Sequence, residues 1–163
     1  MLKKYIIVFL ISMIPLIELR GAVPVGLSSA FEDALPVIPL YIVCIIGNML
    51  PVPIIFFFAR KVLEWGAHKK IIGKFFTFCL EKGEKGGKKL QEKAGRGLYF
   101  ALFLFVGIPL PGTGAWTGTL AASLLDMDFK KSIIAVMAGV VLAGIIMGLA
   151  SAGVFGVVGK LIS

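Results

Sequence analysis

The sequence predicts an all-α integral membrane protein made of two repeats. Of its 163 residues, 58% are hydrophobic and 16% are charged, and the mean hydropathy is +0.98. A soluble domain is about 45–50% apolar and about 25% charged. The apolar residues form continuous runs, whereas a membrane barrel shows alternating segments of roughly ten residues. Breaks rich in proline and glycine interrupt the apolar sequence twice, in corresponding places.

The first break, residues 15–24, places Glu18 and Arg20 inside hydrophobic sequence. A charge at membrane depth costs roughly 2.5–3.5 kcal/mol on insertion scales, so a chain that keeps two either uses them or pairs them. Backbone groups freed at such a break must face protein or a water-filled cavity. Three residues of the segment disfavour an unbroken helix: Pro15, Gly21 and Pro24.

The second break, residues 109–118, follows the same order of features. Each break lies between two short apolar runs, and acidic residues and a long apolar run come next. Pro15 and Pro109 are 94 residues apart, as are Glu32 and Asp126. Interrupted hydrophobic segments in corresponding positions of two halves point to the binding site of a transporter.

Two interpretations of the first break remain open. Residues 5–17 form an apolar run that spans about 20 Å as a helix, which is too short for a hydrocarbon core of roughly 30 Å. Residues 5–31 therefore form either one kinked spanning helix or a re-entrant hairpin with the break at its tip. The density of helix breakers favours the hairpin.

Each repeat ends in a full transmembrane helix, expected over residues 34–58 and 133–158. Pro51 and Pro53 predict a kink in the first of these, and Asn48 is expected to face protein rather than lipid. If the basic middle segment is cytoplasmic, the two hairpins enter from opposite faces as an inverted repeat. The kinked alternative puts both termini inside, which suits Lys3 and Lys4 better.

The charge divides the chain into membrane repeats at residues 1–59 and 98–163 and a basic segment at 60–97. Eleven Lys/Arg and four Glu lie between residues 60 and 96. This excess predicts a cytoplasmic loop, and apolar residues at helical spacing in its first part predict an amphipathic helix at the membrane surface. No nucleic-acid recognition module accompanies the charge, so nucleic acid is not an expected partner.

The sequence offers little for enzymatic chemistry. Cys44 and Cys79 have no metal-ligand spacing, and no catalytic constellation lies near either break. We expect no metal, no cofactor and no enzymatic activity.

The segments 18–24 and 109–118 resemble the two signatures of the bacterial small multidrug export proteins. The resemblance covers essentially the whole chain and implies a multi-pass protein of the bacterial inner membrane. The architecture is also similar to that of the DedA-like proteins, which carry two opposed re-entrant hairpins. Some of those are implicated in flipping undecaprenyl phosphate or scrambling lipids. The chain departs from them because its second hairpin has no charge between residues 98 and 125.

The leading hypothesis is a secondary transporter or flippase for an amphiphile with an anionic headgroup, such as a lipid phosphate. Arg20 would bind the phosphate with its guanidinium fork, helped by the amides of residues 112–115, and Glu18 would couple transport to protons or ions. The candidate binding residues are Glu18, Arg20, Gly21, Pro24, Asn48, Pro111, Gly112, Thr113, Gly114, Trp116 and Thr117.

Three alternatives stay open. Proton-coupled export of lipophilic cations would use Glu18 as the binding carboxylate, with Arg20 repelling the substrate. The protein could be a scaffold that transports nothing. Glu18 and Arg20 could also pair only to hold the tip of the hairpin. Membrane lipids are the expected surroundings, and a homodimer is the expected assembly.

Overall fold

The computed structural model describes residues 2–15, 17–28, 35–68, 73, 74, 77, 81, 95, 97–110 and 112–162, without the side chains of residues 60, 63 and 154–162. Across these residues the fold is all-helical, which confirms the predicted class. The helices are α1 (Leu2–Met13), α2 (Glu18–Leu27), α3 (Val37–Met49), α4 (Pro51–Ala67), α6 (Gly97–Gly107), α7 (Ala115–Leu124) and α8 (Phe129–Ile162).

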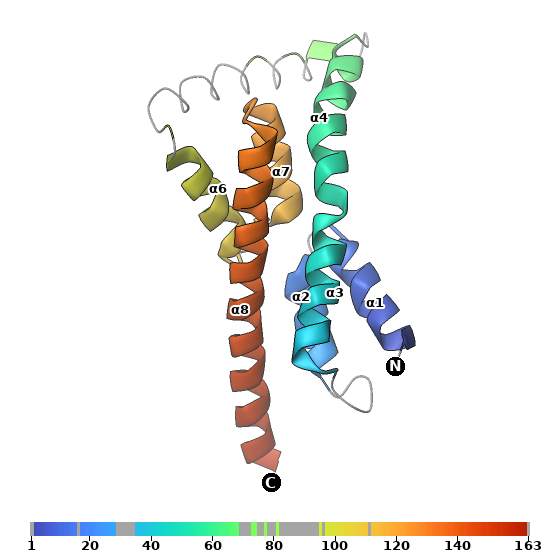
Figure 1. Cartoon of the computed structure of the whole chain (residues 1–163), viewed down its shortest axis with the longest axis vertical. Helices are drawn as coiled ribbons and strands as arrows, with labels where there is room; N and C mark the ends of the chain where they lie inside the picture. The colour runs from blue at the N-terminus through green and yellow to red at the C-terminus, as the bar shows by residue number, and fades with distance from the viewer. Residues whose placement is uncertain are drawn as a thin grey trace.

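The same order of helices occurs twice along the chain. Two short helices, α1 and α2, precede the long α3–α4 pair, and two short helices, α6 and α7, precede the long α8. Figure 1 shows α1 running to the middle of the molecule and α2 turning back to the end where both termini lie. The α6–α7 hairpin opens at the opposite end, so the two tips meet near mid-height.

Two helical stretches, Val37–Ala67 and Phe129–Gly153, are long and apolar enough to cross a membrane. Leu50, which separates α3 from α4, has helical backbone angles (φ −60°, ψ −43°), and it directly precedes Pro51, in the region where a kink was expected. Large apolar side chains on the outside of these stretches are exposed, as on a lipid-facing surface: Ile38, Ile42, Ile46, Ile134, Ile145 and Leu149.

Helix α4 continues past the expected boundary between residues 59 and 60 and ends at Ala67. No proline or glycine separates Pro53 from Gly66, so nothing in the local sequence stops the helix at residue 59. The later apolar positions of the expected amphipathic helix, such as Ile72 and Phe76, lie outside the described residues.

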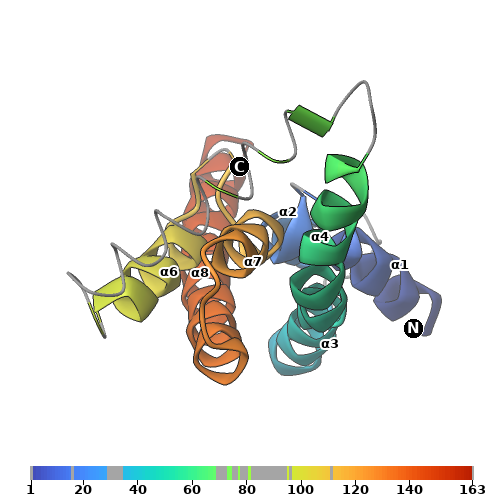
Figure 2. The ribbon, with the colours of Figure 1, turned by 90° about the horizontal axis from the view of Figure 1, so that it is seen from above.

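Small residues bring α8 close to its neighbours (Figure 2). An added Cβ at Gly139 would lie 2.8 Å from the carbonyl oxygen of Phe103, and one at Gly144 would lie 3.1 Å from the Tyr41 ring. The Tyr41 hydroxyl donates to the Gly144 carbonyl at 2.7 Å. The same Cβ at Gly144 would lie 3.1 Å from Leu19 Cδ2 of α2. The face of α8 that carries these glycines therefore packs against α6 on one side and against α2 and α3 on the other, and so contacts both hairpins.

Candidate functional site

Glu18 connects the tip of the first hairpin to the start of α7. Its Oε2 accepts the Ala115 N–H at 3.1 Å and its Oε1 accepts the Trp116 N–H at 3.0 Å. The first N–H groups of a helix have no partner within the helix and carry a partial positive charge. Glu18, which is only 3% exposed, therefore caps a helix of the second hairpin.

Arg20 caps a helix end of the opposite polarity, the C-terminus of α6. Hydrogen bonds join its two terminal nitrogens to backbone oxygens of the second hairpin. Nη1 donates to Leu110 O (2.8 Å) and Thr113 O (3.0 Å), and Nη2 donates to Val106 O (2.9 Å) and Ile108 O (3.2 Å). The last carbonyls of a helix lack partners and carry a partial negative charge, so a guanidinium is well placed there.

The two charged side chains therefore bind the opposite hairpin. Both Glu18 and Arg20 form their hydrogen bonds with backbone atoms of α6, α7 and the loop between them. Within the described part of the chain, no ion pair joins Glu18 directly to Arg20. The expectation that the two might pair to hold one tip is replaced by a cross-hairpin arrangement, in which they hold the two tips together.

The second tip is built to receive these side chains. Gly114 (φ +141°) is buried against the Glu18 carboxylate, where an added Cβ would lie 2.7 Å from Cδ. Gly112 (φ +81°) is exposed with open space around it. The Thr113 hydroxyl lies 2.9 Å from the carbonyl oxygens of both Ile108 and Leu110, which folds the loop onto the end of α6.

A cavity of about 300 Å³ lies beside Glu18 at the junction of the tips. Among the described residues that line it, Glu18 alone is charged, and the others are mostly apolar. The lining consists of Pro15, Glu18, Ile55, Thr113, Trp116, Thr117 and Leu120. The indole Nε1 of Trp116 is buried without a hydrogen-bond partner in the described structure.

Of the predicted site residues, the structure brings together at the tips Glu18, Arg20, Gly112, Thr113, Gly114, Trp116 and Thr117. Gly21 and Pro24 lie inside α2 and do not line the cavity. Asn48 is buried in α3, and its Oδ1 has no partner in the described structure, but it does not line the cavity either. Pro111 lies outside the described residues.

Sequence reasoning missed three lining residues: Pro15, Ile55 and Leu120. It noted Pro15 only as a helix breaker. Ile55 and Leu120 belong to apolar helices, α4 and α7, in which many residues of the same kind occur. Only the packing of α4 against α7 selects these two, and no local sequence signal distinguishes them. In the described residues, no three His, Cys, Asp or Glu side chains gather closely enough to hold a metal ion.

Residues 18–146 match the model of a family described as "Putative small multi-drug export protein". The chain belongs to this family. The match begins at Glu18 and includes α2, the tip of the second hairpin, every described lining residue of the cavity except Pro15, and the first half of α8. With its two long apolar helices and exposed apolar surface, this family member is a membrane protein, and the family description is that of a transporter. No curated protein and no solved structure matches the chain.

Proposed function

We propose that this protein is a secondary exporter of lipophilic cations and that Glu18 is the carboxylate that binds them. The observation that carries the proposal is the cavity beside Glu18, whose described lining has one charge, a negative one, on an otherwise mostly apolar wall. An intramembrane ionisable residue is a candidate functional site by default, and the family description is that of an exporter.

The cavity chemistry suits a cation with a hydrophobic body. Trp116 lines the cavity beside Glu18 and offers an aromatic face, to which cations bind with about 0.5–2 kcal/mol. Ile55 and Leu120 provide apolar contact on the α4 and α7 sides. The cavity lies within one chain, so binding here needs no second copy, and the homodimer stays a prediction.

The position of Arg20 supports a cation more than an anion. All four of its terminal N–H donors are engaged by backbone oxygens, so the guanidinium fork is not free for a phosphate. Of the amides of residues 112–115, the Ala115 N–H donates to Glu18 and the Thr113 N–H donates to the Leu110 carbonyl oxygen. The guanidinium fork and two of the amides that the lipid-phosphate hypothesis names are therefore in use, while the carbonyl dipoles around Arg20 offset the charge that would repel a cation.

Competition between a proton and the substrate cation for the Glu18 carboxylate would couple export to proton movement. The carboxylate can hold a proton or a cation, but not both. Glu18 also has a left-handed backbone (φ 54°), which costs roughly 1–2 kcal/mol and is offset by its charge-assisted hydrogen bonds of about 1.5–3 kcal/mol each. Protonation weakens these bonds and leaves the strain, so it favours separation of the two tips.

In the membrane, we place the two hairpins as re-entrant segments that enter from opposite faces and form an inverted repeat. The short lengths of α1, α2, α6 and α7 support this placement, as does their opposed arrangement in Figure 1. Transporters with such repeats bind substrate near the midplane, between discontinuous helices. By the positive-inside rule, the basic segment supports assigning the opening of the α6–α7 hairpin to the cytoplasmic face of the inner membrane.

The test measures binding of tetraphenylphosphonium and of a long-chain lipid phosphate to purified protein in nanodiscs. In a Trp65→Phe background, Trp116 is the remaining tryptophan and reports on the cavity by fluorescence. We expect Glu18→Gln to weaken tetraphenylphosphonium binding about 30-fold or more and Trp116→Leu, measured by isothermal calorimetry, to weaken it about fivefold. Glu64→Gln, which removes an exposed acid of α4, is the matched control and should bind as the parent does.

The same experiment separates the substrate classes. If an anionic lipid is the substrate, Arg20→Lys loses lipid phosphate binding while Glu18→Gln keeps it, which would overturn the cation proposal. If well-folded Glu18→Gln and Glu64→Gln bind tetraphenylphosphonium equally, Glu18 is a structural cap and the proposal is wrong. Size-exclusion chromatography checks the fold of each variant.

A further inference from the structure

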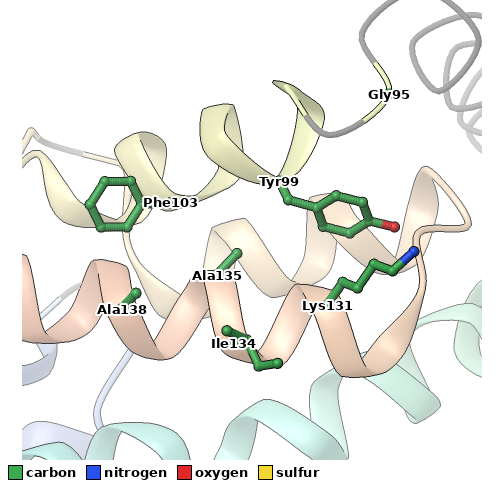
Figure 3. Close-up of a pocket in the computed structure, with 7 residues that line it drawn as sticks. All are labelled: Gly95, Tyr99, Phe103, Lys131, Ile134, Ala135 and Ala138. Atoms are coloured by element: carbon green, nitrogen blue, oxygen red, sulfur yellow. The ribbon is translucent and has the colours of Figure 1, made fainter.

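A second and larger hollow lies away from the tips, in the groove between α6 and α8. Its volume is about 660 Å³, and its described lining residues are Gly95, Tyr99, Phe103, Lys131, Ile134, Ala135 and Ala138 (Figure 3). None of them lines the cavity beside Glu18. This groove is independent of the function proposed above.

Most of the groove is apolar and built along α8. Ile134 and Ala135 are adjacent on that helix, Ala138 lies one turn later, and Phe103 of α6 lies beyond them (Figure 3). From Lys131 to Ala138 the groove follows α8 for about 10 Å at 1.5 Å per residue. The alanines leave room that larger side chains would fill, so the groove can accept a narrow apolar chain.

One end of the groove is polar and positively charged. The Lys131 Nζ lies 5.7 Å from the centre of the Tyr99 ring, and Figure 3 shows the ammonium and the Tyr99 hydroxyl at the same end. The hydroxyl oxygen accepts the Asp128 N–H at 3.3 Å, which leaves its own proton free to donate. The Asp128 carboxylate accepts the Lys131 N–H at 2.9 Å and so caps α8, and it is not among the lining residues.

We propose that this groove binds an anionic phospholipid, with its phosphate on Lys131 and Tyr99 and an acyl chain along Phe103 and Ala138. The charge of the described lining is positive, which complements a phosphate. Lys131 belongs to the first turn of the span Phe129–Gly153, which is headgroup depth, and the apolar part extends inward from it. The cytoplasmic leaflet, to which the basic segment assigns this end, holds the anionic lipids.

The test is native mass spectrometry of the full chain after reconstitution with equal amounts of phosphatidylglycerol and phosphatidylcholine. We expect preferential retention of phosphatidylglycerol. Lys131→Gln should lower that retention about fivefold or more, whereas Lys131→Arg should keep it. Lys130→Gln is the matched control, because it removes the same charge one residue earlier on an exposed position outside the groove.

A second variant tests the apolar half of the site. Ala138→Trp fills the groove without touching the charge, and we expect the same loss of phosphatidylglycerol. Circular dichroism and size-exclusion chromatography confirm the fold of each variant. Equal retention by Lys131→Gln and Lys130→Gln would overturn the site, as would equal retention of the two lipids by the parent.

Two further results would indicate that the groove holds something other than a lipid. Displacement of phosphatidylglycerol by inorganic phosphate at matched concentration would show a site for a free anion and overturn the lipid proposal. A change of oligomeric state in Ala138→Trp, measured by light scattering, would show that a second copy of the chain covers the groove, and would also overturn it.

Discussion

The two hairpin tips differ in how many of their backbone N–H and C=O groups find hydrogen-bond partners within the same hairpin. The turn between α1 and α2, residues 14–17, is short and largely closed by its own hydrogen bonds: the Glu18 N–H donates to Ile14 O at 3.0 Å, and the Gly21 N–H donates to Ile17 O at 3.0 Å. The turn between α6 and α7 is longer, from residue 108 to 114, and contains two glycines with positive φ. It therefore leaves the carbonyls of α6 and the amides of α7 without partners from their own helices.

This difference makes the tips complementary. The first tip carries two charges that its own backbone does not use, and the second carries two helix ends of opposite polarity without side-chain charges to cap them. Glu18 and Arg20 meet those ends. The absence of charge from the second hairpin, which set this chain apart from the DedA-like pattern, fits a division of roles between the two repeats.

The opposed arrangement itself gives the largest, all-or-none prediction. In a Cys79→Ser background, single cysteines are placed at Lys3, Pro36 and Lys130, all exposed in the structure. Native Cys44 stays, because it is fully buried. With a re-entrant first hairpin, an impermeant maleimide labels Lys3→Cys and Pro36→Cys from one face and Lys130→Cys from the other. Labelling of Lys3→Cys and Pro36→Cys from opposite faces would establish the kinked spanning helix instead.

The next prediction compares the two capping side chains, Arg20 and Glu18. Arg20→Ala leaves four carbonyl groups without their donor, and we expect a loss of about 3–5 kcal/mol in the free energy of unfolding. Glu18→Gln keeps an oxygen acceptor and loses the charge, so about 1–2 kcal/mol is expected. Arg20→Lys should fall between them. Denaturant unfolding in detergent, followed by tryptophan fluorescence, measures all three, and equal losses for Arg20→Ala and Glu18→Gln would contradict the comparison.

Much of the fold could be predicted from the sequence, because helix breakers and apolar runs are local signals. The breaks, the short helices around them and the two spanning stretches follow from proline, glycine and hydropathy. Glu18 and Arg20 were found because a charge at that depth is costly. Their partners could not be found in this way, because those partners are backbone groups, which every residue has.

The role expected for Arg20 also shows that backbone partners distant in the sequence cannot be predicted from local patterns. Its fork suggested a phosphate, since a phosphate and a row of helix-terminal carbonyls both present oxygen atoms to a guanidinium. The choice between them depends on where α6 ends relative to α2, about 90 residues apart in sequence. No spacing within either segment encodes that placement.

The smallest expected difference, between two glycine variants of one loop, isolates the fit between the two tips. Gly112 and Gly114 lie in the same loop and both have positive φ. Alanine at Gly112 meets open space, so its cost is the backbone term alone, about 1–2 kcal/mol. Alanine at Gly114 would place Cβ 2.7 Å from the Glu18 Cδ, which adds about 1–3 kcal/mol of overpacking.

A double-mutant cycle decides whether that extra cost belongs to Glu18. Denaturant unfolding is measured for both glycine variants, with and without Glu18→Ala. If the carboxylate contributes to the limit at Gly114, the difference between the two glycine variants shrinks by about 1–3 kcal/mol in the Glu18→Ala background, because the clash has gone while the backbone cost of each position remains. A difference that is unchanged without the carboxylate would show that Gly114 is required by its own backbone conformation alone (φ +141°, ψ −175°), and that the close approach of the two tips is not what selects glycine there.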